Sequence, residues 1–340
     1  MRKCYRRNFV TKKNVLLLCG GGGSEHEVSL VSVKHIQNCI SKIDFVNVTK
    51  IEINKSGDWV DDSGKKYMLD TKKFLRSMDH SDAGMKIDVA IPCIHGYPGE
   101  TGELPAYFEM IGLPYLGCNS ETSKMCFNKI TTKLWATALG VPNTPYIFLA
   151  ADTMESAERV KGFQALYGDI VVKASNQGSS VGCFLVEKGK DPVATVKEAF
   201  KFSPFVLVEK RMKPREIEVS VYEYDGKLQI SYPGEIICPG AFYSYEEKYS
   251  KGSQTTTTTR AEDLTPEQVR LITDYSSKLY HGLKLRHLSR VDYFLDEGTI
   301  YLNEINTFPG LTPISMFPKM MEANGHSFKD FLSQLIRNLE

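Results

Sequence analysis

The sequence predicts an α/β fold that is α+β overall, with an open parallel sheet in its N-terminal part. Residues 15–19 are apolar and lead into four glycines and then a helix over about 25–40, an order typical of a buried parallel strand and the helix after it. Two further runs, 45–53 and 86–93, also have strand character. The rest of the chain mixes strands and helices and contains a β-hairpin over 290–306, which indicates α+β structure there.

Length and composition fit a protein of two or three domains. The chain has 340 residues, 42% of them hydrophobic and 24% charged, with a net charge of +1. This balance gives no reason to expect nucleic acid or a membrane as partner. The eight cysteines form no C-x-x-C pair, which predicts reduced thiols and a cytoplasmic protein. We expect residues 1–13, a basic segment, to be a flexible extension.

The glycine run after the first strand lies where an open α/β sheet binds its ligand. A dinucleotide-binding loop would need glycine at position 25, where Glu25 stands, and acidic residues there would repel a pyrophosphate. Glu25 and Glu27 either complement the helix dipole or hold a substrate ammonium, and their position favours the second reading.

The third strand of the first unit ends in a second glycine-rich loop, residues 95–103, which carries His95. A structural hydrogen bond and a catalytic role are both open for His95. A helix over 104–111 follows, and the first unit closes near residue 120.

The second unit begins with a helix over 123–139 that carries Lys129, and a new sheet starts at 146–148. Residues 169–186 read as strand, glycine-serine loop and strand. Main-chain N–H groups of such a loop can hold phosphate oxygens, with Lys173 as a point charge at its base, although a hairpin loop without function has the same composition. It is not a Walker A loop, because no G-K-[ST] follows.

Three later segments suggest the rest of a nucleotide site. The strand over 205–212 ends with Glu209 to Met212, whose main chain could bind adenine while Glu216 takes the ribose. Residues 241–252 combine aromatic and charged side chains in a long loop, which is either a lid over substrate or a mobile connector. A helix over 265–281 starts with Thr265 as cap, and the five threonines at 255–259 have no assigned role.

The hairpin over 290–306 predicts a metal site. A three-residue loop would place Asp292 opposite Leu302, with Leu302, Glu304 and Asn306 on one face and Asp292 diagonal to Glu304. Two carboxylates and an amide oxygen suit Mg²⁺, which completes its octahedron with phosphates and water. Arg290 lies on the same face and could hold a phosphate or an oxyanion. A solvated polar face is the alternative.

Taken together, the order of these motifs resembles the D-alanine–D-alanine ligase family of the ATP-grasp superfamily. The motifs are residues 22–30 (GGSEHEVSL), His95–Gly96 with Gly99–Glu100, 173–182, 246–249 (EEKY), 290–292 (RVD), and 303–307 (NEINT) with Pro309–Gly310. The resemblance implies an N-terminal substrate domain (14–120) and two subdomains (121–211 and 212–340) that sandwich ATP. It also implies ligation of two D-alanines through an acyl phosphate, two Mg²⁺ ions with Mn²⁺ as a substitute, peptidoglycan precursor synthesis and a homodimer.

The resemblance assigns roles residue by residue. Glu27 would hold the ammonium of the first D-alanine, linked through Ser179 to Tyr249, and Arg290 would stabilise the oxyanion. The expected ATP ligands are Lys129, Lys173, Glu209, Lys210, Met212, Glu216 and Lys248. The expected metal ligands are Asp292, Glu304 and Asn306. The expected substrate contacts are His95, Gly310, Ser315 and Met316.

The sequence departs from the family pattern in the loop after His95, where Thr101 replaces an aspartate and Pro105–Ala106 stands where Gln-Gly is frequent. Met316 stands where leucine is common, which leaves a D-alanine–D-serine or D-lactate ligase as the alternative. Lys248–Tyr249 favours an amino acid over D-lactate. A non-catalytic ATP-binding module is the rival from another class, although it would need no oxyanion donor.

Overall fold

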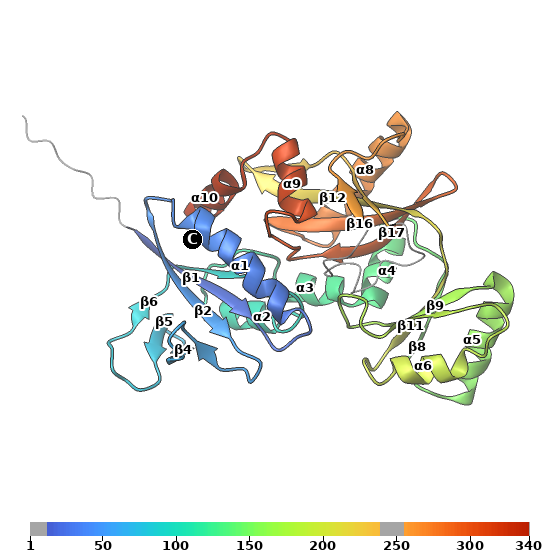
Figure 1. The fold of residues 1–340 in the computed structure, drawn as a ribbon, viewed down its shortest axis with the longest axis horizontal. Coiled ribbons are helices and arrows are strands. Elements are labelled where there is room, and N and C mark those ends of the chain that lie inside the picture. The colour runs from blue at the N-terminus through green and yellow to red at the C-terminus, as the bar shows by residue number, and fades with distance from the viewer. Residues whose placement is uncertain (1–11, 239–254, 340) are drawn as a thin grey trace, which may run out of the picture.

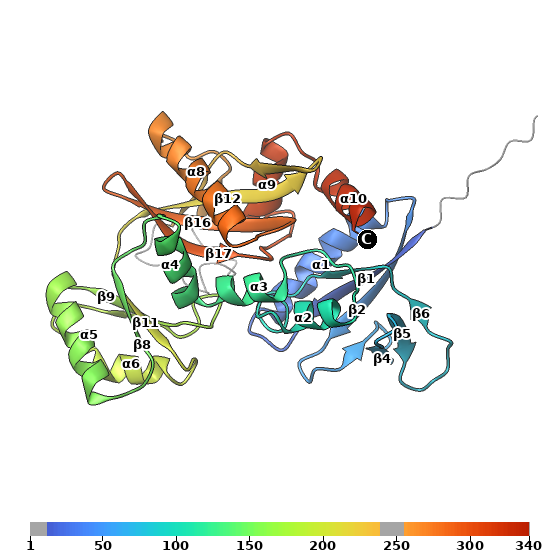
Figure 2. The same cartoon turned by 180° about the vertical axis from the view of Figure 1, so that it is seen from behind.

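The computed structural model describes residues 12–238 and 255–339, which contain a seven-stranded, a four-stranded and a six-stranded β-sheet (Figure 1). The predicted N-terminal extension, apart from its last two residues, and the predicted lid over 241–252 lie outside these ranges. Within them, no helix is both long and apolar enough to cross a membrane. Seen from either side, the four-stranded sheet lies at one end of the molecule and the seven-stranded sheet at the other (Figures 1 and 2).

The N-terminal sheet has a parallel part, as predicted, and an antiparallel extension. Its parallel strands are β1 (Lys13–Gly20), β2 (Val46–Ile53) and β7 (Val89–Pro92), with β1 in the middle. Helices α1 (His26–Ile40) and α2 (Glu103–Met110) accompany them. The antiparallel extension consists of four short strands: β3 (Trp59–Val60), β4 (Lys66–Leu69), β5 (Phe74–Ser77) and β6 (Met85–Lys86).

The single helix predicted over 123–139 is wrong, because two helices occupy this segment: α3 (Ser120–Phe127) and α4 (Lys129–Ala138). Between them Asn128 has an extended backbone, with φ −83° and ψ 108°. Its side-chain oxygen accepts the N–H groups of Ile130 and Thr131, so it caps α4. Lys129 therefore stands at the start of a helix rather than inside one.

The four-stranded sheet has the order β10-β9-β11-β8 and is antiparallel between all neighbours. Its elements are β8 (Tyr146–Leu149), α5 (Met154–Tyr167), β9 (Ile170–Ala174), β10 (Cys183–Val186), α6 (Val193–Ala199) and β11 (Val206–Lys210). Helix α5 has no counterpart among the predicted elements. Its buried face includes Ser156 and Gln164 beside Val160 and Phe163, so the hydrophobic period is weak.

The six-stranded sheet holds the predicted hairpin as β16 and β17. Its strands are β12 (Arg215–Tyr224), β13 (Lys227–Ile230), β14 (Gly234–Ile237), β15 (Thr256–Thr258), β16 (Leu288–Asp296) and β17 (Thr299–Asn306). Its helices are α8 (Pro266–Gly282), α9 (Met316–Ala323) and α10 (Phe328–Asn338). The threonine run supplies β15, which pairs with β14 at the sheet edge. The predicted cap at Thr265 is confirmed as a capping box.

The register predicted for the hairpin is wrong by one residue near its tip and by two residues near the metal site, where the sequence predicts Leu302 opposite Asp292. Asp292 pairs with Glu304, and Tyr293 pairs with Leu302, so Asn303 is the extra residue of a β-bulge. Because the bulge reverses the alternation of faces, Leu302 is buried in the core with Tyr293 instead of sharing a face with Glu304. Asp292 is therefore directly opposite Glu304, and Arg290 is opposite Asn306.

The N-terminal sheet and the C-terminal helices share one hydrophobic core. Val15 and Leu17 of β1 and Ile36 of α1 belong to the same buried cluster as Phe331 and Leu335 of α10. In Figure 1 helix α10 lies beside α1. The first and last parts of the chain are thus joined by apolar packing, and the domain boundaries near residues 120 and 211 remain a prediction.

A polar junction also joins these two parts. The N–H group of Gly117 donates to Nδ1 of His287 at 3.0 Å, and the N–H group of His287 donates to Glu223 at 2.9 Å. Nε of Arg286 donates to the carbonyl of Gly117 at 2.7 Å. Burial lowers the pKa of His287 to about 4, because it outweighs the opposing charge of Glu223, and Arg286 adds a smaller lowering effect.

We expect this junction to make the protein acid-sensitive. Because the pKa of His287 is about 4 in the fold and about 6.5 in the unfolded chain, the unfolded state binds more protons between these pH values. The unfolding free energy should therefore fall by up to about 3 kcal/mol as pH drops through this range. Urea unfolding at several pH values should show a shallower slope in His287→Asn, which keeps an acceptor and tolerates the left-handed φ of 63°. His281→Asn, at an exposed position, should leave the slope unchanged.

Candidate functional site

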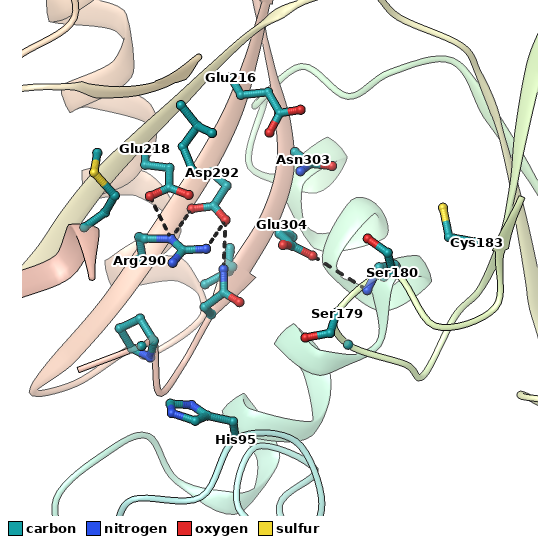
Figure 3. Close-up of a pocket in the computed structure, with 18 of the residues that line it drawn as sticks. His95, Ser179, Ser180, Cys183, Glu216, Glu218, Arg290, Asp292, Asn303 and Glu304 are labelled. Carbon is teal, nitrogen blue, oxygen red and sulfur yellow. Dashed lines mark hydrogen bonds and ion pairs between the residues drawn. The ribbon is translucent and has the colours of Figure 1, made fainter. Parts of the chain in front are cut away.

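One cavity of about 1000 Å³ lies where the three sheets meet. Every predicted site residue within the described ranges lines it: Glu27, His95, Lys129, Lys173, Ser179, Glu209, Lys210, Met212, Glu216, Arg290, Asp292, Glu304, Asn306, Gly310, Ser315 and Met316. Lys248 and Tyr249 lie outside the described residues. Side chains far apart in the chain thus converge on one space (Figure 3).

The glycine-serine loop between β9 and β10 reaches the N-terminal sheet. Ser179 and Ser180 both have left-handed backbones, with φ of 48° and 61°, an uncommon conformation for serine that is concentrated at functional sites. Ser179 donates its hydroxyl hydrogen to Glu25 Oε1 at 2.6 Å. A Cβ on Gly178 would lie 2.7 Å from Glu25 Oε2, so only glycine allows this approach.

The predicted link between Ser179 and Glu27 is therefore wrong, since the acid in contact with Ser179 is Glu25. Glu25 precedes the first residue of α1 and points across to the serine loop. The Glu27 side chain, two residues further on, is 71% exposed and pairs with Lys55 at 3.2 Å. It borders the cavity but lies on the outer side of the helix.

A second carboxyl, which is buried, lies within the electrostatic influence of Glu25. Glu100 is buried, and burial followed by the negative charge of Glu25 raises its pKa to about 8. The same mutual repulsion would be relieved by a cation between these acids. The neighbourhood of Glu25 is therefore electrostatically suited to an ammonium group.

Two lysines hold the carboxylate of Glu209 in the floor of the cavity. Lys173 Nζ lies 2.5 Å from Glu209 Oε2, and Lys133 Nζ lies 2.6 Å from Oε1. The Thr144 hydroxyl donates to Oε1 at 2.5 Å. Burial acts to raise the pKa of Glu209, but the two lysines outweigh it and the pKa is lowered. Burial acts to lower the pKa of Lys173, and Glu209 raises it overall.

Lys133 was not predicted as a site residue. It is 1% exposed and lies one helical turn after Lys129 on α4. Burial lowers its pKa despite the opposing charge of Glu209. Lys129 and Lys133 are four residues apart on an amphipathic helix, and in the sequence both look like solvent-exposed lysines of one helix face. No local pattern therefore indicates that Lys133 is buried.

Lys129 connects the serine loop with the hairpin. Its ammonium donates to the carbonyl of Gln177 at 2.7 Å and lies 3.7 Å from Glu304 Oε2. Its main-chain N–H donates to the carbonyl of Ser175 at 3.0 Å. Lys129 and Lys173 thus place positive charge at both sides of the loop that was predicted to cradle phosphate.

Arg290 and Asp292 form a bidentate pair on the cavity face of β16 (Figure 3). Nε and Nη2 of Arg290 each lie 2.8 Å from one oxygen of Asp292. Arg290 Nε also lies 3.3 Å from Glu218, and the amide of Asn306 donates to Asp292 at 2.9 Å. Burial would lower the pKa of Arg290, but Asp292 and then Glu218 raise it further above its usual value. The guanidinium therefore stays charged inside the site.

The hairpin offers hard oxygen donors rather than a complete metal cage. Among the described residues, no group of three His, Cys, Asp or Glu side chains is placed to hold a metal ion. Asp292, Glu304 and Asn306 supply two carboxylates and an amide on one strand pair. This set fits Mg²⁺, which takes one or two carboxylates and completes its shell with phosphates and water.

The predicted second-substrate residues lie on the loop before α9 and at the first residue of this helix. The Ser315 hydroxyl accepts the N–H of Thr312 at 3.1 Å and contacts the Thr312 hydroxyl at 2.8 Å. A Cβ on Gly310 would lie 3.0 Å from Ser315 Oγ, so the two residues are adjacent. Met316 is buried, and its methyl group packs against Gly234.

Comparisons with known proteins show the family to which the chain is similar. The family models described as D-ala D-ala ligase N-terminus and D-ala D-ala ligase C-terminus match residues 14–118 and 134–337. The chain is 51% identical to the D-alanine–D-alanine ligase of Vibrio cholerae serotype O1, over 97% of this chain and 100% of that protein.

Solved structures give the same result. The chain is similar to D-alanyl-alanine synthetase A from Vibrio cholerae O1 biovar eltor, with a TM-score of 0.91 and 51% identity over 97% of this chain and 98% of that one. It is also similar to the VanG D-Ala:D-Ser ligase from Enterococcus faecalis, with a TM-score of 0.84 and 25% identity over 96% of this chain and 99% of that one.

We expect Lys133 to be a large contributor to stability. Lys133→Met would leave a buried carboxylate with one cationic partner fewer, so the unfolding free energy should fall by about 3 kcal/mol. Lys161→Met, which removes an exposed lysine 3.9 Å from Glu158, should change it by less than about 0.5 kcal/mol. Urea unfolding of both variants checks this. A loss below about 1 kcal/mol in Lys133→Met would contradict it.

Proposed function

The chain belongs to the D-alanine–D-alanine ligase family, and we propose that it joins two D-alanines into D-alanyl-D-alanine, with conversion of ATP to ADP and phosphate. The product serves peptidoglycan precursor synthesis. The observation that carries the proposal is the convergence, in one cavity, of the Glu25 carboxylate, the phosphate-side lysines and the hairpin oxygens. The 51% identity to ligases of this name, over 97% of this chain, supports it.

ATP binding falls to the four-stranded sheet and its loops. Lys129 and Lys173 face the phosphates, with main-chain groups of the serine loop as further donors. Glu209, Lys210 and Met212 form the adenine segment at the end of β11, and Glu216 takes the ribose hydroxyls. Because Lys133 compensates the charge of Glu209, the positive charge of Lys173 remains available to phosphate.

Asp292, Glu304 and Asn306 would hold the two expected Mg²⁺ ions, or Mn²⁺ in their place. Bound there, the ions neutralise the transferring phosphoryl group. Asp292 already carries a cationic partner in Arg290, so the carboxylate is kept ionised and oriented. Asp292, Glu304 and Asn306 thus determine where the ions would bind, and the negative charges of the two carboxylates suit a divalent cation.

The first D-alanine binds with its ammonium at Glu25, which Ser179 orients through its hydrogen bond. One carboxylate oxygen attacks the γ-phosphorus of ATP, the bond to the β-γ bridging oxygen breaks, and ADP leaves. The resulting acyl phosphate has an activated carbonyl carbon. Positioning of the two reactants in one cavity supplies much of the rate in such transfers.

The second D-alanine binds with its carboxylate near Ser315 and the Gly310 amide. Its neutral amine attacks the acyl carbon, and Arg290 with Gly310 stabilises the oxyanion of the tetrahedral intermediate. Inorganic phosphate then leaves with the electron pair of the C–O bond, and the amine loses its extra proton. A peptide bond results.

The family relation also suggests a cytoplasmic homodimer that acts on small molecules. The alternative, in which D-serine or D-lactate is the second substrate, is not favoured, because the closely similar relatives are named for D-alanine alone. Met316 follows Ser315 and is the position to examine if another acceptor is used.

Phosphate release tests the function directly. With ATP, Mg²⁺ and D-alanine alone we expect release of phosphate and formation of the dipeptide, with no release for L-alanine. Glu304→Gln should lower the rate at least about hundredfold through loss of a cation ligand and a charge beside the phosphates. Glu297→Gln, at the exposed hairpin tip, should have the rate of the unchanged protein.

Release that requires D-serine or D-lactate would overturn the acceptor assignment. ATP binding without release for any acceptor would instead support the non-catalytic module. Chelation of the metal with EDTA, followed by titration with Mn²⁺, separates loss of the cation from loss of the protein fold.

A matched pair of variants tests the ammonium site. Glu25→Gln should lower kcat/KM for D-alanine about tenfold to hundredfold, because one charge-assisted hydrogen bond is worth about 1.5–3 kcal/mol. Glu27→Gln should change it by less than about threefold, since that side chain is exposed and paired with Lys55. Steady-state kinetics over D-alanine concentration measures both. The reverse order would restore Glu27 as the ammonium ligand.

A further inference from the structure

The loop after β7 grips a single peptide unit of the C-terminal sheet region. His95 and Glu100, at the two ends of this loop, contact the carbonyl and the N–H group of Phe308. Both side chains are buried, at 4% and 9% exposure, and so is Phe308 at 5%. The carbonyl and the N–H group of Phe308 are therefore both held by side chains of the N-terminal sheet region.

The ring of His95 has a defined tautomer. Its Nδ1 lies 3.0 Å from the carbonyl oxygen of Phe308, which can only accept, so Nδ1 carries the hydrogen. Its Nε2 lies 3.1 Å from Ser32 Oγ and accepts the hydroxyl hydrogen. Burial lowers the pKa of His95, in keeping with a neutral ring. Both ring nitrogens are thus used within the protein.

The carboxyl of Glu100 completes the grip. Oε1 accepts the N–H of Phe308 at 3.1 Å, and Oε2 accepts the N–H of Gly96 at 2.9 Å. The second bond ties Glu100 to Gly96, the residue next to His95, so the two side chains are linked through the backbone of this loop. The ring of Phe308 packs near Gly117, which limits rotation of the gripped peptide.

Phe308 lies two residues after Asn306 and two before Gly310. We propose that His95 and Glu100 are positioning residues that fix the segment 306–310 relative to the N-terminal sheet. This segment carries the side-chain amide of Asn306, assigned to the metal, and the main-chain N–H of Gly310, assigned to the oxyanion. The inference rests on the proposed function for its catalytic consequence. The loop also borders the ammonium site, since a Cβ on Gly96 would lie 3.4 Å from Glu25 Oε2.

The residues assigned to ATP and the segment held by His95 and Glu100 belong to different parts of the fold. The phosphate lysines and the adenine segment belong to α4 and the four-stranded sheet, whereas the gripped peptide follows β17 of the six-stranded sheet. Loosening Phe308 should therefore lower kcat while leaving the KM for ATP nearly unchanged. A misplacement of about 1 Å at the reacting groups can cost about hundredfold in rate.

A matched pair at position 95 isolates the bond to Phe308. His95→Asn places an amide N–H near the position of Nδ1 and can still donate to the Phe308 carbonyl, whereas His95→Gln places its amide near Nε2 and can reach only Ser32. We expect kcat to fall less than about fivefold in His95→Asn and about tenfold to hundredfold in His95→Gln. KM for ATP should stay within about threefold in both.

Glu100→Gln tests the other half of the grip, because an amide can accept only one of the two N–H groups. Hydrogen–deuterium exchange, read by mass spectrometry on the full chain without substrate, should be at least about tenfold faster over residues 307–311. Glu103→Gln, an exposed carboxyl on α2, is the control and should leave exchange unchanged. Peptides from β1 and β11 report whether each variant is folded.

The double variant His95→Gln/Glu100→Gln should lose little more activity than either single variant, because both act on one peptide. Equal effects of His95→Asn and His95→Gln, or unchanged exchange at 307–311 in folded Glu100→Gln, would overturn the proposal. If Glu100→Gln does not fold, the pair at position 95 decides alone. Exchange needs no substrate, so its result is independent of the ligation assay.

Discussion

A one-residue bulge in the β16–β17 hairpin determines which side chains of the C-terminal sheet reach the cavity. Before the bulge, the alternation of faces places Leu302 in the core beside Tyr293. After it, the alternation is reversed, and Glu304 comes directly opposite Asp292. A regular hairpin would expose an apolar side chain to the cavity or bury a carboxylate in the core, and each is costly. The bulge thus allows β17 to place Leu302 in the hydrophobic core and Glu304, two residues later, in the polar site.

Charge balance then decides how the acids and bases of the cavity can coexist. Glu209 is buried with lysines on both of its oxygens, and Arg290, whose side chain is 18% exposed, lies between Asp292 and Glu218. In both groups each ion has an opposite charge within hydrogen-bonding reach, which offsets the cost of removing it from water. The region around Glu25 and Glu100 is different, since burial and the charge of Glu25 together raise the pKa of Glu100. That imbalance is what makes it suitable for a cationic group of a substrate.

The sequence was informative where a pattern is local and poor where a contact is long-range. Strand runs, the cap at Thr265 and the converging loops could be predicted, because each has a signal within a few residues. Asn128 divides a helix by capping the second half, a break that a hydrophobic period alone does not reveal. The choice between Glu25 and Glu27 depends on the path of a loop more than 150 residues later in the chain, so no local reading separates them. Lys133 is likewise identified only by the strand that carries its partner, Glu209.

The N-terminal sheet is joined to the C-terminal helices by apolar packing, and to the four-stranded sheet by a polar contact at the cavity. The N-terminal sheet and the C-terminal helices share a hydrophobic cluster that includes Leu17, Ile36 and Phe331. The four-stranded sheet has a cluster of its own around Ile170 and Val208, and it meets the N-terminal sheet at the cavity through the hydrogen bond from Ser179 to Glu25. Apolar burial holds two parts in a fixed relation, whereas a polar contact in a solvent-lined cavity contributes about 1 kcal/mol and can be exchanged for a ligand. The side of the cavity assigned to the amino acids is therefore rigidly framed, and the side assigned to ATP is joined to it by groups that also bind substrate.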